Sequence, residues 1–139
     1  MVTEPKIDEQ YVKTGKVYYI AHMVGYDSQA LEAFAAALCA NDQGKYWEYS
    51  KVLYENQGRF DRNSLASYAQ QIGLDAQVFT SCLSQGKHSQ DARDSTDVTQ
   101  AVGVKGTPSF FINGRLVIEA AKPFAEFQAR IEDALTRSK

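Results

Sequence analysis

The 139-residue chain has the length of one domain, and its 44% hydrophobic and 12% aromatic content is typical of a globular protein. Its formal net charge is −2 with both signs interspersed, which argues against nucleic acid or an anionic membrane surface as partner. No apolar run approaches the roughly 18 residues that a membrane-spanning helix needs, and residues 1–6 lack the basic and apolar regions of a secretory signal.

The first predicted elements are a helix over residues 3–14 and a strand over residues 17–20. Thr3 is a candidate N-cap, and Gly15 is expected to end the helix. Residues 17–20 are β-branched and aromatic, a composition that favours a strand. One face of the helix is expected to pack in the core through Ile7 and Tyr11.

Five helices are predicted between Asp27 and about Val102. They begin at Asp27 or Ser28, near Lys45, after Asp61, after Asp75 and near Ser89, and the third stops at Gly73. Apolar residues recur at helical spacing in three of them: Leu31, Phe34, Ala35 and Leu38; Leu65, Tyr68, Ala69 and Ile72; Val78, Phe79, Cys82 and Leu83. The second helix carries an aromatic group in which packing is favoured over a peptide-binding surface: Tyr46, Trp47, Tyr49 and Tyr54.

The last part of the chain predicts a hairpin followed by a helix. Asn113-Gly114 separates strands over residues 109–112 and 115–118, and a type I′ turn requires positive φ at both turn positions. Pro123 is expected at the first position of the final helix. That helix is expected to face the core through Phe124, Phe127, Ile131 and Leu135.

The two cysteines, Cys39 and Cys82, are too far apart to form a redox motif by local spacing. As free thiols they would be small buried hydrophobes. Neither His22 nor His88 has metal-ligand spacing to them, so no zinc site and no cofactor are expected. We expect His88 to be a solvated turn residue. His22 is expected to be a structural histidine, with a place along an active site as the alternative.

The stretch Gly-Val-Lys-Gly-Thr-Pro-Ser-Phe-Phe-Ile-Asn-Gly at residues 103–114 resembles the cis-proline loop of thioredoxin-fold proteins, and of the DsbA family in particular. Further motifs similar to that family cover nearly the whole chain: residues 4–17, 43–49, 54–57 and 79–87. The resemblance implies an α/β, thioredoxin-like fold. It further implies a single domain over residues 1–139, with an all-helical insertion at about 27–102 between the second strand and the cis-proline hairpin.

The same resemblance implies thiol–disulfide exchange with protein substrates in an extracytoplasmic compartment. Gly106, Thr107 and Pro108 would then dock an extended peptide beside a reactive sulfur. A DsbA-like protein would place a first strand and a Cys-x-x-Cys pair ahead of the first helix, whereas this sequence begins inside that helix and contains no such pair. We therefore expect the chain to be truncated and inactive in exchange as it stands.

The resemblance also implies a structural disulfide between Cys39 and Cys82, because some DsbA-like proteins bridge their helical insertion and an oxidising compartment preserves such bonds. Loss of the first strand would leave residues 17–20 and 109–112 with unpaired edges, so a homodimer or a rearranged sheet is expected. Two alternatives remain open. One is a non-catalytic module that binds peptides or a partner, and the other is a glutathione-using branch such as the kappa-class transferases or chromene-carboxylate isomerases.

Overall fold

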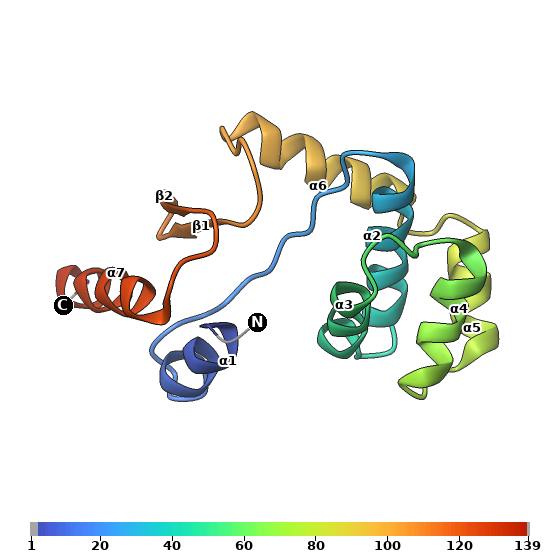
Figure 1. Ribbon diagram of the computed structural model, residues 1–139, viewed down its shortest axis with the longest axis horizontal. Coiled ribbons are helices and arrows are strands. Elements are labelled where there is room, and N and C mark those ends of the chain that lie inside the picture. Colours follow the sequence, from blue (N-terminus) through green and yellow to red (C-terminus); the bar gives the residue numbers. More distant parts are fainter. Residues whose placement is uncertain (1–2, 139) are drawn as a thin grey trace. The chain divides into compact units, whose positions relative to one another are not determined.

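The computed structural model describes residues 3–138, which form two compact units (Figure 1). One unit combines the residues up to Ala21 with those from Gly103 onwards, and the other spans His22–Val102. The elements in chain order are α1 (Thr3–Ile7), the π-helix η1 (Asp8–Val12), α2 (Ser28–Asn41), α3 (Tyr46–Glu55), α4 (Arg62–Gln71), α5 (Ala76–Ser84), α6 (Ser89–Ala101), β1 (Ser109–Ile112), β2 (Arg115–Glu119) and α7 (Phe124–Arg137). The helical insertion expected at about residues 27–102 lies within the second unit.

In the unit spanning His22–Val102, helix α2 contacts each of α3, α4, α5 and α6. Three of these helices begin at an aspartate whose carboxylate accepts a hydrogen bond from a backbone N–H three residues later. The caps are Asp27 for α2, Asp61 for α4 and Asp75 for α5. Such caps satisfy an N–H that the helix itself leaves unpaired, which is why these three starts were predictable.

The core of this helical unit is built around the alanine-rich face of α2 and a buried tyrosine. Tyr49 is fully buried, its ring packs against Phe79 at 5.3 Å between centroids, and its hydroxyl donates to the Leu65 carbonyl at 2.9 Å. Val78 belongs to an apolar stripe that was expected to face inward together with Phe79 and Cys82, and for Val78 this expectation is wrong, since the residue is 53% exposed. The small side chains of α2 allow several helices to approach it closely.

The other unit has its own core, formed by α1, η1, the hairpin and α7. β1 and β2 pair antiparallel, and the turn residues Asn113 and Gly114 have φ of 49° and 80°, as the type I′ prediction required. Phe127 of α7 packs edge-on against Phe110 at 4.6 Å. The predicted core positions of the two terminal helices are all found in or against this cluster: Ile7, Tyr11, Phe124, Phe127, Ile131 and Leu135.

Residues 17–20 do not form a strand, which corrects the prediction. Val17 and Tyr19 pack against the core of their unit, whereas Tyr18 and Ile20 are 89% and 63% exposed. The two-residue alternation of a strand is therefore present. A strand, however, also needs a hydrogen-bonded neighbour, and the sheet formed by the described residues contains only β1 and β2.

Two helix predictions also need correction. The helix expected over residues 3–14 is α-helical only to Ile7 and continues as a π-helix, in which the Lys13 N–H donates to the Asp8 carbonyl five residues back. Thr3 lies within α1, and its hydroxyl donates to the Lys122 carbonyl. Pro123 occupies the N-cap position of α7, one residue before the predicted place.

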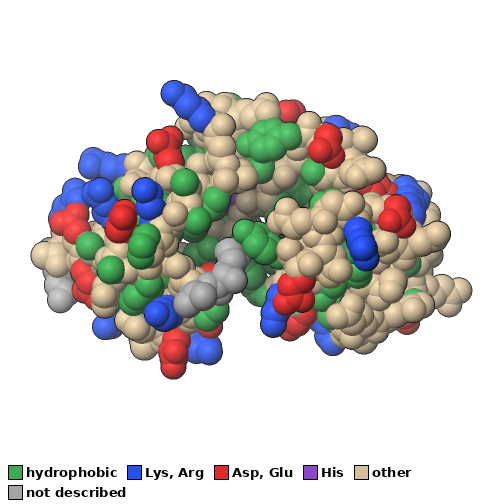
Figure 2. Space-filling view, in the orientation of Figure 1, with side chains coloured by type: hydrophobic (Ala, Val, Ile, Leu, Met, Phe, Trp, Pro, Cys, Tyr) green, Lys and Arg blue, Asp and Glu red, His purple; other side chains and the backbone are tan. Residues whose placement is uncertain are grey.

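Acidic and basic side chains are interspersed on the face of the protein drawn in Figure 2, in agreement with the nearly balanced composition. None of the helices formed by residues 3–138 combines the length and apolar character that crossing a membrane requires.

Candidate functional site

The loop at Gly106, Thr107 and Pro108 precedes β1 and is exposed at all three residues. The peptide bond between Thr107 and Pro108 is cis. The Pro108 carbonyl accepts a hydrogen bond from the Ala120 N–H at 2.8 Å, and the Ser109 hydroxyl donates to the Gly106 carbonyl at 2.6 Å. The loop is thus anchored on both sides of Thr107.

Thr107 itself presents free backbone groups. Within residues 3–138, neither its N–H nor its carbonyl has a hydrogen-bond partner. A Cβ placed on the neighbouring Gly106 would meet no atom within 4 Å, so the space beside the loop is open. An exposed backbone N–H and carbonyl on one residue can pair with an extended peptide, as the edge of a sheet pairs with an added strand.

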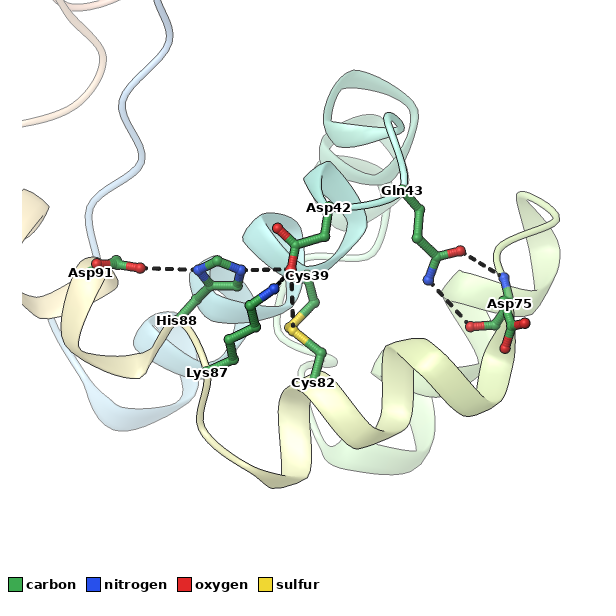
Figure 3. The surroundings of a disulfide bond; sticks show 8 residues. All are labelled: Cys39, Asp42, Gln43, Asp75, Cys82, Lys87, His88 and Asp91. Atoms are coloured by element: carbon green, nitrogen blue, oxygen red, sulfur yellow. Dashed lines mark hydrogen bonds and ion pairs between the residues drawn. A yellow bond between two sulfur atoms is a disulfide. The ribbon is translucent and has the colours of Figure 1, made fainter.

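The second candidate feature is a disulfide between Cys39 of α2 and Cys82 of α5 (Figure 3). The bond implied by the resemblance is therefore present, and the reading of two free thiols is wrong. Both residues are buried, at 1% and 8% exposure. As a disulfide the pair offers no thiolate for nucleophilic attack, and it cross-links two helices of the same unit.

Four polar residues form a chain of contacts that begins at the sulfur of Cys82 and runs through Asp42 (Figure 3). Oδ2 of Asp42 lies 2.7 Å from Lys87 Nζ, 2.9 Å from His88 Nε2 and 3.8 Å from Cys82 Sγ. The other ring nitrogen of His88, Nδ1, lies 3.0 Å from Asp91 Oδ2. An ammonium group, an imidazole and a sulfur atom therefore all lie around one carboxylate oxygen at the Cys82 end of the disulfide.

These contacts shift the pKa values of the groups involved. Hydrogen bonds from Lys87 and then from His88 hold the pKa of Asp42 below its usual range. Partial burial alone would lower the pKa of His88, but its bonds to Asp42 and Asp91 outweigh that effect and raise it. His88 lies in a turn, as predicted, and is the N-cap residue of α6, but the expectation that it is solvated is wrong, since its side chain is only 16% exposed.

The other residues considered from the sequence do not join this cluster. His22 is exposed, with Nδ1 at 3.5 Å from the Ser95 hydroxyl. In the aromatic group, Tyr49 is buried and Tyr46 packs against the core, whereas Trp47 and Tyr54 are about half exposed. The packing prediction therefore holds for only part of that group.

Three residues of the cluster were not predicted as site residues from the sequence: Asp42, Lys87 and Asp91. Asp42 follows Cys39 by one helical turn, and Lys87 and His88 follow Cys82 by five and six residues. Once Cys39 and Cys82 are paired, the residues that follow each cysteine must lie near one another. The disulfide pairing was thus the signal that could have found them.

Comparison with known proteins places these features in a family context. A family model described as thioredoxin matches residues 2–133. A protein of Rickettsia bellii named as a protein-disulfide oxidoreductase is 27% identical over 116 residues, which cover 79% of this chain and 45% of that protein. The Na(+)/H(+) antiporter NhaA 1 of Salinispora arenicola is 35% identical over 83 residues, covering 60% of this chain and 13% of the antiporter.

Among solved structures, oxidised BdbD from Bacillus subtilis superposes with a TM-score of 0.75 at 18% identity, covering 95% of this chain and 76% of BdbD. This structural similarity shows that the chain shares the fold of BdbD. The chain spans less than half the length of the two sequence relatives named above.

Proposed function

This chain belongs to the thioredoxin family, with a DsbA-like fold, and on that premise we propose that it is the peptide-docking part of a thiol–disulfide oxidoreductase acting on proteins outside the cytoplasm. The observation that carries the proposal is the exposed loop at Gly106, Thr107 and Pro108, with unpaired backbone groups on Thr107 among the described residues. The Rickettsia bellii relative, named as a protein-disulfide oxidoreductase, supports the same activity class.

The reactive dithiol of such an enzyme is not among the two cysteines seen here. Exchange requires a thiolate that attacks a disulfide and a second thiol that resolves the mixed disulfide. Cys39 and Cys82 are joined to each other and buried. In this proposal residues outside the printed sequence supply the dithiol, and the loop at Thr107 holds the substrate backbone beside it.

Peptide docking is tested directly by titrating the isotopically labelled chain with a reduced and alkylated unfolded protein. We expect amide shifts concentrated at residues 105–109, and weaker binding in Thr107→Arg, whose long charged side chain obstructs the loop. Arg115→Ala, at the exposed start of β2, is the matched control and should bind as the wild type does. Shifts spread evenly over the helical unit would contradict the docking proposal.

The catalytic half of the proposal is tested by insulin reduction with this chain and with the full-length gene product. The chain alone should be silent, and the longer protein should be active. Activity from neither would remove the oxidoreductase proposal. In that case the second candidate would be a non-catalytic peptide-binding module. The observation that favours it is that both cysteines of the chain are joined in one disulfide.

Self-association is a further part of the proposal. β1 pairs only with β2 in the sheet that residues 3–138 form, and Tyr18 and Ile20 are exposed. Open strand edges and exposed apolar side chains favour pairing between copies. Sedimentation at increasing protein concentration should reveal a dimer, and a monomer throughout the micromolar range would contradict it.

A further inference from the structure

Three different metal-binding side chains converge at the Cys82 end of the disulfide (Figure 3). Oδ2 of Asp42, Sγ of Cys82 and Nε2 of His88 all lie within 4.8 Å of one another. In a tetrahedral zinc site, with Zn–S of about 2.3 Å and Zn–N of about 2.0 Å, neighbouring ligand atoms lie about 3.3–3.8 Å apart. The observed separations of 2.9 Å from Asp42 to His88 and 3.8 Å from Asp42 to Cys82 are close to that spacing.

The imidazole of His88 is also held as a metal ligand would be. Metal-binding histidines almost always direct their second ring nitrogen to a carboxylate, a carbonyl or water, which fixes the ring orientation. Here Asp91 lies 3.0 Å from Nδ1, and Nε2 is turned toward Asp42. This second carboxylate is a separate observation from the convergence of the three ligand atoms.

Cys39 would supply a fourth ligand once the disulfide is opened. A dithiol reductant delivers two electrons and two protons to the S–S bond, which becomes two thiols while the reductant becomes a disulfide. A divalent cation that binds both sulfurs then releases two protons to water. The resulting ligand set is two thiolates, one imidazole and one carboxylate, which suits zinc rather than calcium or magnesium.

Charge and mobility at the site favour the exchange. Lys87 Nζ now lies 2.7 Å from the Asp42 oxygen, and its side chain is 58% exposed, so it can move into solvent. Two thiolates and the Asp42 carboxylate carry three negative charges, which Zn²⁺ and the nearby Lys87 ammonium together balance. In the reduced chain, bound Zn²⁺ thus takes the place of the Lys87 ammonium group on the Asp42 oxygen.

We infer that Cys39, Cys82, His88 and Asp42 form a zinc-type metal site when a dithiol reduces the disulfide. Exchange with a disulfide oxidant, which takes two electrons from the thiolates and two protons from water as it becomes a dithiol, re-forms the Cys39–Cys82 bond and releases the metal. The four ligands come from α2 and the residue that ends it, from α5 and from the start of α6. Bound metal would therefore cross-link the same helices that the disulfide cross-links. The inference is independent of the proposed oxidoreductase activity.

The test uses Co²⁺, whose absorption reports thiolate ligation and tetrahedral geometry. The chain is reduced with dithiothreitol, freed of the reductant without oxygen, titrated with Co²⁺ and then back-titrated with Zn²⁺. We expect one Co²⁺ per reduced chain with a tetrahedral thiolate spectrum, displacement by Zn²⁺, and no such spectrum from the oxidised chain. Equal binding by the oxidised chain would overturn the inference.

Variants distinguish metal binding by all four ligands from metal binding by the two thiols alone. His88→Gln should weaken Co²⁺ binding by at least about 10-fold, and Asp91→Asn by about 10-fold through loss of the ring orientation. His22→Gln, which changes the other histidine of the chain, is the matched control and should bind as the wild type does. If His88→Gln and Asp42→Asn both bind as tightly as the wild type, the site does not exist.

Circular dichroism keeps the test decisive if reduction alone unfolds the chain. Metal binding to ligands from separate helices is coupled to folding. One equivalent of Zn²⁺ should then restore the helical signal of the reduced chain. A reduced chain that neither binds the metal nor refolds with it would also overturn the inference.

Discussion

Tyr49 combines a complete loss of solvent contact with a satisfied hydroxyl group. Burial first, and the neighbouring Tyr68 second, raise the pKa of this phenol far above its ordinary value. We predict that Tyr49→Phe lowers the free energy of unfolding by about 1 kcal/mol at neutral pH, because the hydrogen bond to Leu65 is lost. Urea unfolding followed by circular dichroism measures the difference.

The pH dependence of the same variant provides an independent check. The folded-state pKa is raised, so the contribution of Tyr49 to stability is complete below the unfolded-state pKa of about 10 and declines as the pH rises above it. Tyr49→Phe should therefore lose less stability than the wild type between neutral pH and alkaline pH. Tyr54→Phe, at a half-exposed tyrosine, is the control. An identical alkaline decline in Tyr49→Phe and wild type would refute this account.

At the scale of elements, the β1–β2 hairpin depends on the left-handed backbone of its turn. Gly114 has φ of 80°, a conformation that costs a residue with a side chain about 1 kcal/mol. Gly114→Ala should therefore lower the free energy of unfolding by about that amount, as measured by urea unfolding. The added methyl group meets no atom within 4 Å, so the effect isolates backbone strain.

Gly106→Ala is the matched control for this prediction. The space beside Gly106 is equally open, and its backbone does not have a positive φ. Its substitution should change stability by less than a few tenths of a kcal/mol, as is usual for exposed sites without a special role. Equal losses in both variants would mean that the strain in the turn is not the cause.

The elements also show which kinds of feature can be predicted from a sequence. Capping aspartates, glycine stops and the Asn-Gly turn act over a few residues, so the helices and the hairpin were expected at nearly their observed positions. The strand predicted over residues 17–20 is wrong, because these residues alternate in exposure as a strand would but pair with no neighbour among residues 3–138. Pairing depends on a neighbour distant in the sequence, which local composition does not describe.

The same distinction explains the candidate sites. The loop at Gly106, Thr107 and Pro108 is a continuous stretch of the chain, so it could be predicted from the sequence alone. The cluster at Asp42 and His88 is made of residues 46 positions apart, brought together only when α2 and α5 pack. His88 was therefore assigned to solvent, because the sequence around it is polar and nothing local indicates a partner.

The disulfide acts between elements, since it ties α2 to α5 across a separation of 43 residues. In the chain-entropy model a loop of this length stabilises the folded state by about 4 kcal/mol. The double variant Cys39→Ala with Cys82→Ala should lose an amount of that order in urea unfolding. Reduced wild-type protein, kept free of divalent metal, is the control and should show a similar loss. A loss of unfolding free energy below about 1 kcal/mol would mean that packing alone holds α2 against α5 and that the disulfide adds little to stability.

At the scale of the whole molecule, residues 3–138 form two hydrophobic clusters of buried residues. The core built around α2 and Tyr49 lies entirely within His22–Val102, and the core around Phe127 lies entirely in the unit formed by the two ends of the chain. The helices predicted as an insertion at about residues 27–102 lie in one of these units, and the loop at Thr107 lies in the other.

The division predicts that a fragment comprising residues 22–102 folds by itself. It retains all the buried residues of its core, the three aspartate caps and the disulfide. We expect a helical circular dichroism spectrum and a cooperative urea transition, which the Cys39→Ala, Cys82→Ala form of the fragment should show at lower urea concentration. A fragment with helical signal but no cooperative transition would mean that its core needs the rest of the chain, and that the two cores do not act as independent folding units.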